Sequence, residues 1–93
     1  MNRLLFKSSA FVRSAKRVVR KNPQLAENIR ATLELLSADA FHPSLKTHKL
    51  KGNLADSWAC SVAYDLRIVF SFVEHEGKEA VLLEAIGTHD QVY

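Results

Sequence analysis

The stretch SWACSVAYDLRIVFSFV, residues 57–73, decides the fold because its large apolar side chains recur at every second position. In the first half these are Trp58, Cys60, Val62 and Tyr64, and in the second half they are Leu66, Ile68, Phe70 and Phe72. Alternation with a period of two predicts two strands, each with one apolar face. Tyr64-Asp65 lies between them, where an antiparallel hairpin turns. The pattern also places Cys60 in the core, which argues against chemistry at its thiol.

Upstream of this hairpin the apolar period changes to that of helices. The first helix is predicted from Ser8, with an apolar stripe formed by Phe11, Val12, Ala15, Val18 and Val19. Asn22 is expected to cap a second helix and Pro23 to stand in its first turn. That helix continues through Leu25, Ile29, Leu33 and Leu36 to about Asp39. A turn this short predicts an antiparallel helix hairpin.

The remaining segments complete one domain over residues 1–93. RLLF at 3–6 predicts a short first strand, and AVLLEAIG at 80–87 predicts a last strand buried on both sides. Residues 40–57 read as a long loop, a kind of segment that is often functional. The expected fold is therefore α+β, in the order β-α-α-β-β-β. An antiparallel sheet would carry the helix hairpin on one face and leave the opposite face as an exposed, shallow concavity.

Composition limits the class of protein. Apolar residues make up 47% and charged residues 25% of the chain, as in ordinary globular proteins. No apolar run approaches the roughly 20 residues of a membrane-spanning helix. Cys60 is the only cysteine, so no internal disulfide is expected, and a reducing cytoplasm is the expected location. No thiol cluster or closely spaced histidine pair suggests a metal site, and no cofactor is expected.

The charges are divided unevenly along the chain. Residues 1–51 carry eleven Lys and Arg against three acidic residues, whereas residues 52–93 carry two against seven. This asymmetry favours a basic face that meets a polyanion or an acidic protein. Basic residues that simply solvate two surface helices would give the same count, so both interpretations stay open.

Several titratable side chains have no evident structural purpose. LKTHKLKG supplies His48 with Lys46, Lys49 and Lys51, the hairpin supplies Asp65 and Arg67, and the terminal IGTHDQVY supplies His89, Asp90 and Tyr93. Histidines exchange protons near neutral pH, so two of them beside a phosphate could serve as base and acid for attack by a ribose 2′-hydroxyl. A guanidinium stabilises a phosphate that gains charge, lysines hold an RNA backbone, and a tyrosine stacks on a base. The set predicts metal-independent RNA cleavage.

Each of these residues also has a structural interpretation. His48 could be a solvated loop residue, Asp65 suits a turn, and Tyr93 could cover a hydrophobic edge. Arg67 could pair across the strands with Glu84. His42 and His75 are interpreted as loop residues without a functional role.

The motifs LKTHKLKG, YDLRIVF and IGTHDQVY, in this order after two helices, resemble the RelE/ParE superfamily of bacterial toxins, and most closely the RelE/YafQ-like messenger-RNA interferases. The resemblance covers nearly the whole chain. It implies a toxin that enters the ribosomal A site and cuts messenger RNA by 2′-hydroxyl attack, and an antitoxin that blocks it. Its active-site residues would be His48, Asp65, His89 and Tyr93 from the YafQ-like pattern, and Arg67 from the RelE-like pattern.

The sequence departs from that pattern in two places. Ser61 stands where YafQ-like sequences carry a further histidine, and the C-terminal helix common in RelE-like members is not expected here. The resemblance also leaves two alternatives open. One is a ParE-like gyrase inhibitor, and the other is a catalytically inactive homologue that only binds its antitoxin.

Overall fold

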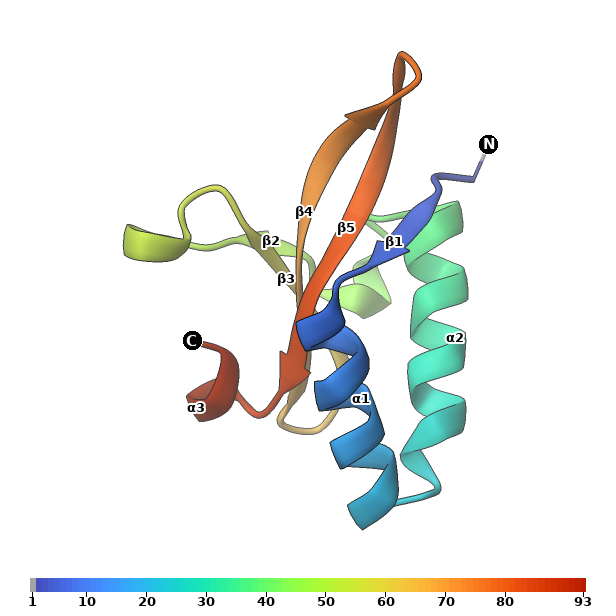
Figure 1. The fold of residues 1–93 in the computed structure, drawn as a ribbon, viewed down its shortest axis with the longest axis vertical. Helices are drawn as coiled ribbons and strands as arrows, with labels where there is room; N and C mark the ends of the chain where they lie inside the picture. The colour runs from blue at the N-terminus through green and yellow to red at the C-terminus, as the bar shows by residue number, and fades with distance from the viewer. Residues whose placement is uncertain (1) are drawn as a thin grey trace.

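The sheet separates a helix hairpin from a small C-terminal turn of helix (Figure 1). The computed structural model describes residues 2–93. The strands are β1 (Leu5–Lys7), β2 (His48–Lys49), β3 (Trp58–Ala63), β4 (Leu66–His75) and β5 (Lys78–Gly87). The helices are α1 (Ser9–Lys21), α2 (Leu25–Ala38) and α3 (His89–Val92), with two 3₁₀ turns, η1 (Pro43–Leu45) and η2 (Gly52–Leu54). Among the described residues, no helix is both long enough and apolar enough to span a bilayer.

The five strands form one sheet in the order β1-β5-β4-β3-β2. β2 pairs antiparallel with β3, β3 with β4 and β4 with β5, and the β3–β4 pair is the hairpin predicted in residues 57–73. The edge strand β1 pairs parallel with β5, with Leu5 opposite Val81. The predicted α+β architecture, with its helix hairpin on one face of the sheet, is thus confirmed, and the parallel pair adds to it.

The two helices form nearly where their apolar spacing predicted. Ser8 caps α1 by accepting a hydrogen bond from the Phe11 amide, and Phe11 is fully buried. The cap expected at Asn22 was wrong, because α2 begins after Gln24, and no side chain caps it. Asn22 instead ends α1, where its backbone N–H donates to the Val18 carbonyl. The connection between α1 and α2 is short, so the two helices form the predicted hairpin.

The main core lies between the helices and the sheet. Its buried side chains from the sheet include Cys60, Ile68, Phe70, Val81 and Leu83. Cys60 is completely buried, as predicted, and burial raises the pKa of its thiol to about 12. The core position and the disfavoured thiolate both make this cysteine a packing residue.

The opposite face of the sheet is less open than the sequence suggested. A second small cluster lies there, formed by Leu50, Ala59 and Val69 with Leu54 and Val92 packed against it. The 40–57 segment therefore does not simply loop out. It contains β2 and two 3₁₀ turns, and it covers part of this face because Leu50 and Leu54 bury their side chains on Ala59 and Val69.

One residue of the alternation leaves the core entirely. Tyr64 was predicted on the apolar face, but its side chain is fully exposed. The pairing of β3 with β4 shifts register between Ser61 and Ala63, so the strand pattern ends one residue before Tyr64. Tyr64 and Asp65 then form the two-residue turn between Ala63 and Leu66.

Candidate functional site

The β3–β4 turn and α3 are joined by the side chain of Asp65. Asp65 has a φ of 54°, in the left-handed region that Asp tolerates better than most residues. Its Oδ1 accepts a hydrogen bond from the His89 backbone N–H at 3.4 Å. Asp65 is therefore a turn residue, which was one of the two interpretations of the sequence, and its carboxylate also contacts the start of α3.

The C-terminal segment folds into α3 because of its own sequence. The Thr88 side chain accepts a hydrogen bond from the Gln91 amide, and the Gln91 side chain accepts one from the Thr88 amide, which is a complete capping box. Thr-x-x-Gln is a recognisable signal for such a cap, and sequence reasoning missed it. The expectation that no C-terminal helix is present was therefore wrong.

Gly87 allows α3 to fold back against the end of β5. A Cβ added at Gly87 would lie 2.7 Å from Gln91 Oε1, closer than real side chains pack, and 3.1 Å from Gln91 Cβ, which is tighter than most such contacts. From this position, Val92 enters the second cluster beside Leu50 and Val69. The last residue, Tyr93, is thereby brought over the sheet face opposite the helix hairpin (Figure 1).

Two histidines that are distant in sequence lie against this tyrosine. The Tyr93 hydroxyl is 3.4 Å from His48 Nε2, and the two rings are edge-on with centroids 6.3 Å apart. The His89 ring lies edge-on to the Tyr93 ring, with centroids 4.3 Å apart. His48, His89 and Tyr93 are all exposed. The structure thus brings together three of the residues selected from the sequence, at a place open to solvent.

The backbone fixes the tautomer of His48. His48 Nδ1 lies 3.1 Å from the Lys46 carbonyl oxygen. A carbonyl oxygen only accepts, so Nδ1 carries the proton and Nε2 of the neutral ring is left as an acceptor. Nε2 is the atom that faces Tyr93, which makes it the basic atom of this surface.

The environment of Tyr93 keeps its phenol protonated. Partial burial raises the pKa of the Tyr93 hydroxyl above its ordinary value, and the positive charge of Arg67 offsets part of this effect. At neutral pH Tyr93 is therefore a hydrogen-bond donor, and its donor proton can point to His48 Nε2.

Arg67 occupies the middle strand of the site. It stands opposite Ser61 on β3 and opposite Gly87 on β5. Its Nη1 donates to the carbonyl oxygens of Ala63 and Leu66, each at 3.3 Å, which holds the guanidinium over the turn. The alternative pairing with Glu84 was wrong, because the Glu84 carboxylate instead accepts a hydrogen bond from the Ser57 hydroxyl at 2.7 Å.

The three loop lysines surround His48 and are exposed. Lys46 ends η1 with a φ of 53°, Lys49 follows His48 in β2, and Lys51 precedes η2. His42 and His75 lie elsewhere. His42 is in the loop before η1, as predicted, whereas the loop prediction was wrong for His75, which is the last residue of β4. His42 caps η1 by accepting from the Ser44 amide, and the His75 ring packs edge-on against Phe6. The local positive charge thus comes from lysines near one of the two site histidines.

Metal ligation is not apparent in residues 2–93, where no three His, Cys, Asp or Glu side chains gather closely enough to hold an ion. The His89 imidazole and the Asp90 carboxylate approach to 3.7 Å, but both are exposed. Such an exposed pair contributes little to stability. Asp90 therefore has no evident role in holding the site together.

Residues 3–93 match the family model described as "Bacterial toxin of type II toxin-antitoxin system, YafQ". The chain belongs to the YafQ toxin family. Among curated proteins, no sequence matches it. This member of the family has imidazoles at His48 and His89 and has Ser61 directly opposite Arg67.

Solved structures of such toxins share its fold. YafQ from E. coli strain BL21(DE3) superposes with a TM-score of 0.79 at 16% identity, covering 98% of each chain. A YoeB/ParE toxin from Agrobacterium tumefaciens gives a TM-score of 0.77 at 16% identity, over 92% of this chain and 98% of that one. The E. coli DinJ–YafQ toxin–antitoxin complex matches with a TM-score of 0.77 at 17% identity, over 100% of this chain and 99% of that one. These likenesses establish the RelE-like fold of this YafQ family member.

Proposed function

We propose that this toxin is a metal-independent endoribonuclease that cuts messenger RNA on the ribosome by attack of a ribose 2′-hydroxyl on the adjacent phosphate. The observation that carries the proposal is the contact of both imidazoles, His48 and His89, with Tyr93. Cleavage of this kind needs one group that accepts a proton and one that donates a proton on the two sides of a phosphate. Two histidines that share one neighbour are close enough to serve the same nucleotide.

The tautomer of His48 supports its role as general base. When RNA binds, its 2′-hydroxyl replaces the Tyr93 hydroxyl at Nε2, and Nε2 takes the 2′-hydroxyl proton. The 2′-oxygen forms a bond to phosphorus while the bond from phosphorus to the 5′-oxygen breaks. His89 donates its proton to that leaving oxygen. The products are a 2′,3′-cyclic phosphate and a 5′-hydroxyl, so atoms and charges balance without a cofactor.

The other site residues stabilise the charge on the phosphate or position the histidines and the RNA. Arg67 offsets the negative charge that builds on the phosphate oxygens, since a guanidinium is the preferred partner of a phosphate. Asp65 serves as a positioning residue, because its carboxylate already accepts from the His89 amide. Tyr93 orients His48 and offers its ring to a base, and Lys46, Lys49 and Lys51 hold the RNA backbone.

The experiment is a cleavage assay in a translation extract, with the cut ends mapped on translated and untranslated messages. His48→Ala and His89→Ala should each lower the cleavage rate by about 10²- to 10⁴-fold, the range for a lost proton-transfer group. His75→Ala is the matched control, because it removes an exposed imidazole far from the site. Normal cutting by both site variants would contradict the proposal. Inhibition of gyrase by the wild-type protein, without RNA cleavage, would favour the ParE-like alternative.

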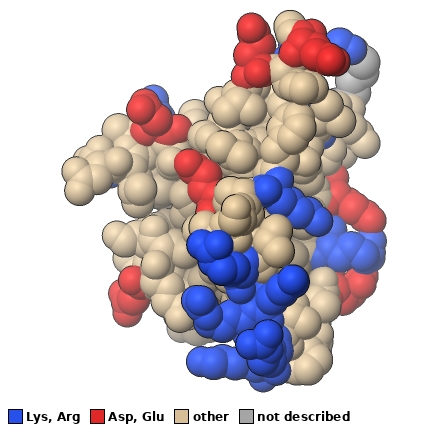
Figure 2. Space-filling model, viewed as in Figure 1, with Lys and Arg blue, Asp and Glu red and all other residues tan. Residues whose placement is uncertain are grey.

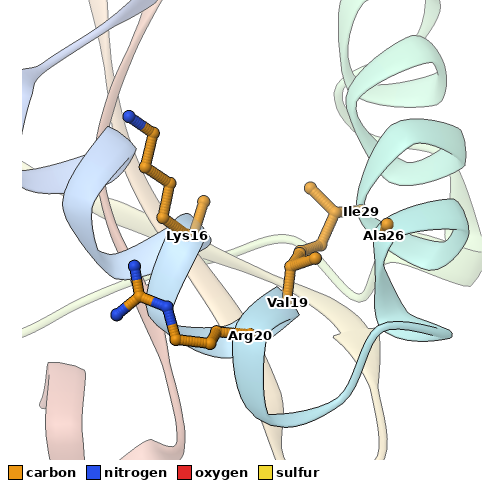
Figure 3. Close-up of a pocket in the computed structure, with 6 residues that line it drawn as sticks. Lys16, Val19, Arg20, Ala26 and Ile29 are labelled. Carbon is orange, nitrogen blue, oxygen red and sulfur yellow. The ribbon is translucent and has the colours of Figure 1, made fainter.

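We also propose that an acidic helix of an antitoxin binds between α1 and α2. Val19 on α1 and Ile29 on α2 face each other there, while Lys16 and Arg20 extend from α1 beside them (Figure 3). Ala15 and Ala26 complete the lining of this groove of about 450 Å³. Apolar walls with a basic rim are complementary to an amphipathic helix rich in acidic residues. The DinJ–YafQ complex is a toxin of the same fold with its antitoxin, which supports a protein partner here.

A further inference from the structure

Tyr64 is a large, fully exposed side chain that has no part in the proposed chemistry. Its ring is 100% accessible, although it follows a strand of buried and half-buried residues. A fully hydrated aromatic ring gives up the free energy of burial that such a side chain normally supplies. Tyr64 therefore contributes no packing within residues 2–93.

Tyr64 lies at the rim of a groove of about 330 Å³ between α1, the β3–β4 turn and α3. The turn lies between these two helices at the lower end of the sheet (Figure 1). The polar side chains that line the groove are Ser14, Arg17, Lys21, Asn22, Asp65, Thr88 and Gln91. A groove of this size is at the lower end of the range for small-molecule sites.

The α1 wall of the groove is positively charged. Arg17 and Lys21 are four residues apart, so they lie on the same side of the helix. Neither forms an ion pair with an acidic group of the described chain. Figure 2 shows Lys and Arg side chains gathered over α1, and α1 contains no acidic residue. These two cations are available to an external anion.

The opposite wall belongs to the proposed catalytic site. Asp65 lines the groove and accepts from the His89 amide, and Thr88 lines it and caps the helix that carries His89 and Tyr93. The groove thus runs directly beside the place where the scissile phosphate would lie. Asp65 is the acidic group of this groove, and its charge keeps a bound phosphate toward α1.

We propose that this groove is a binding subsite for a nucleotide next to the scissile phosphate, whose base stacks on Tyr64 and whose own phosphate binds Arg17 and Lys21. This inference rests on the RNA-cleaving function proposed above. Unpaired bases of single-stranded RNA stack on aromatic rings, and cations beside them hold the backbone. Tyr64 would then set which neighbouring base is preferred at the cut.

The test measures RNA binding separately from RNA cutting. A short single-stranded RNA with a 2′-deoxy sugar at the cut position cannot be cleaved, and its fluorescence anisotropy at low salt reports binding. Tyr64→Ala should weaken binding on the order of tenfold, the loss of one base-stacking contact, whereas Tyr64→Phe should bind like the wild type. Arg17→Ala with Lys21→Ala should weaken binding further than Arg13→Ala, an exposed α1 cation outside the groove.

Cleavage-end sequencing in the translation extract gives the second readout. Tyr64→Ala should flatten the base preference beside the cut, and Tyr64→Phe should preserve it. Tyr64-dependent binding without any cutting by the wild type would support the subsite and overturn the proposed function. Cutting by the wild type with equal binding and an equal cut pattern for Tyr64→Ala would overturn the subsite alone. No RNA binding by the wild type, or loss of antitoxin affinity but not RNA affinity in Tyr64→Ala, would also overturn it.

Discussion

At the scale of single residues, the site depends on how backbone groups orient side chains. The Lys46 carbonyl holds His48 with Nε2 outward, and the Asp65 carboxylate holds the first amide of α3. Both contacts are made by residues that adopt left-handed φ angles, Lys46 at 53° and Asp65 at 54°. These two positions help to place the side chains that the proposed chemistry uses, so their backbone conformation contributes to the site.

Tyr93 has two separable contributions. Tyr93→Phe keeps the ring against His89 but loses the hydroxyl that faces His48, so cleavage should fall about two- to tenfold, the value of one neutral hydrogen bond. Tyr93→Ala should lose more, because the ring is gone as well. The measurement is the initial cleavage rate of a reporter message.

The pKa of Tyr93 predicts how the cleavage rates of the wild type and of Tyr93→Phe compare as the pH changes. Because burial raises that pKa, the hydroxyl stays protonated through neutral and mildly alkaline pH. The ratio of wild-type to Tyr93→Phe rates should therefore be constant between pH 6 and about 9, because this window lies below the ordinary tyrosine pKa of about 10. A ratio that changes within this window would contradict the role of Tyr93 as a donor.

Cys60 provides a residue-scale measure of folding. Its pKa is raised to about 12 by burial, and the thiolate is the reactive form, so iodoacetamide at pH 8 should leave the native protein unmodified. The unfolded chain should react readily. Since the folded pKa is raised, the associated stability is present below pH 9 and is lost as the pH rises toward 12. Rapid labelling of the native protein would show that the core opens there.

At the scale of elements, one helical turn decides where the chain ends. α3 depends on a capping box at Thr88 and Gln91, on the close approach at Gly87, and on Val92 in the second cluster. A four-residue helix has no stability of its own, so these tertiary contacts hold it. The position of Tyr93 is thus a property of the fold around it.

Gly87→Ala tests this dependence. The added methyl group would overlap Gln91, so α3 should be displaced and cleavage should fall at least tenfold, since a misplaced group near the chemistry is costly. Hydrogen exchange should show loss of protection at the amides of Val92 and Tyr93, which donate to Thr88 and His89. The main core should keep its protection. Unchanged exchange and cleavage would mean that α3 does not position the site.

At the scale of the whole molecule, the sheet separates two working surfaces. The groove between α1 and α2 lies on the helix side, and β2 and α3, which bring His48 and His89 to Tyr93, lie on the other (Figure 1). The Lys and Arg side chains of α1 lie between them, within reach of either partner (Figure 2). The proposed RNA surface and the proposed antitoxin surface thus lie on different sides of one chain of 93 residues.

The two surfaces should respond to different substitutions. Ala26→Glu adds a negative charge in the α1–α2 groove and should weaken antitoxin binding about tenfold or more, while cleavage stays at the wild-type rate. Ala31→Glu is the control, an exposed position of α2 outside the groove. Calorimetry with the purified antitoxin measures the change. Equal affinity of both variants would place the antitoxin elsewhere.

Local sequence determined most of the elements. The alternation in residues 57–73 and the helical spacing from Phe11 to Leu36 depend on which side chains face a core, and that can be read from the order of residues. The motifs around His48, Asp65 and His89 also indicated the family. Asn22 and Tyr64 were misplaced because a cap and a register shift depend on one or two backbone torsions, which propensity does not fix.

Only the tertiary structure decided how the distant residues meet. His48 and Tyr93 are 45 positions apart, and their contact results from β2 pairing with β3 and from α3 folding onto Leu50 and Val69. Burial of apolar area between segments distant in sequence drives both events, and it leaves no periodic pattern in either segment. The sequence therefore names the groups of the site, whereas the packing of its two small covering segments sets their geometry.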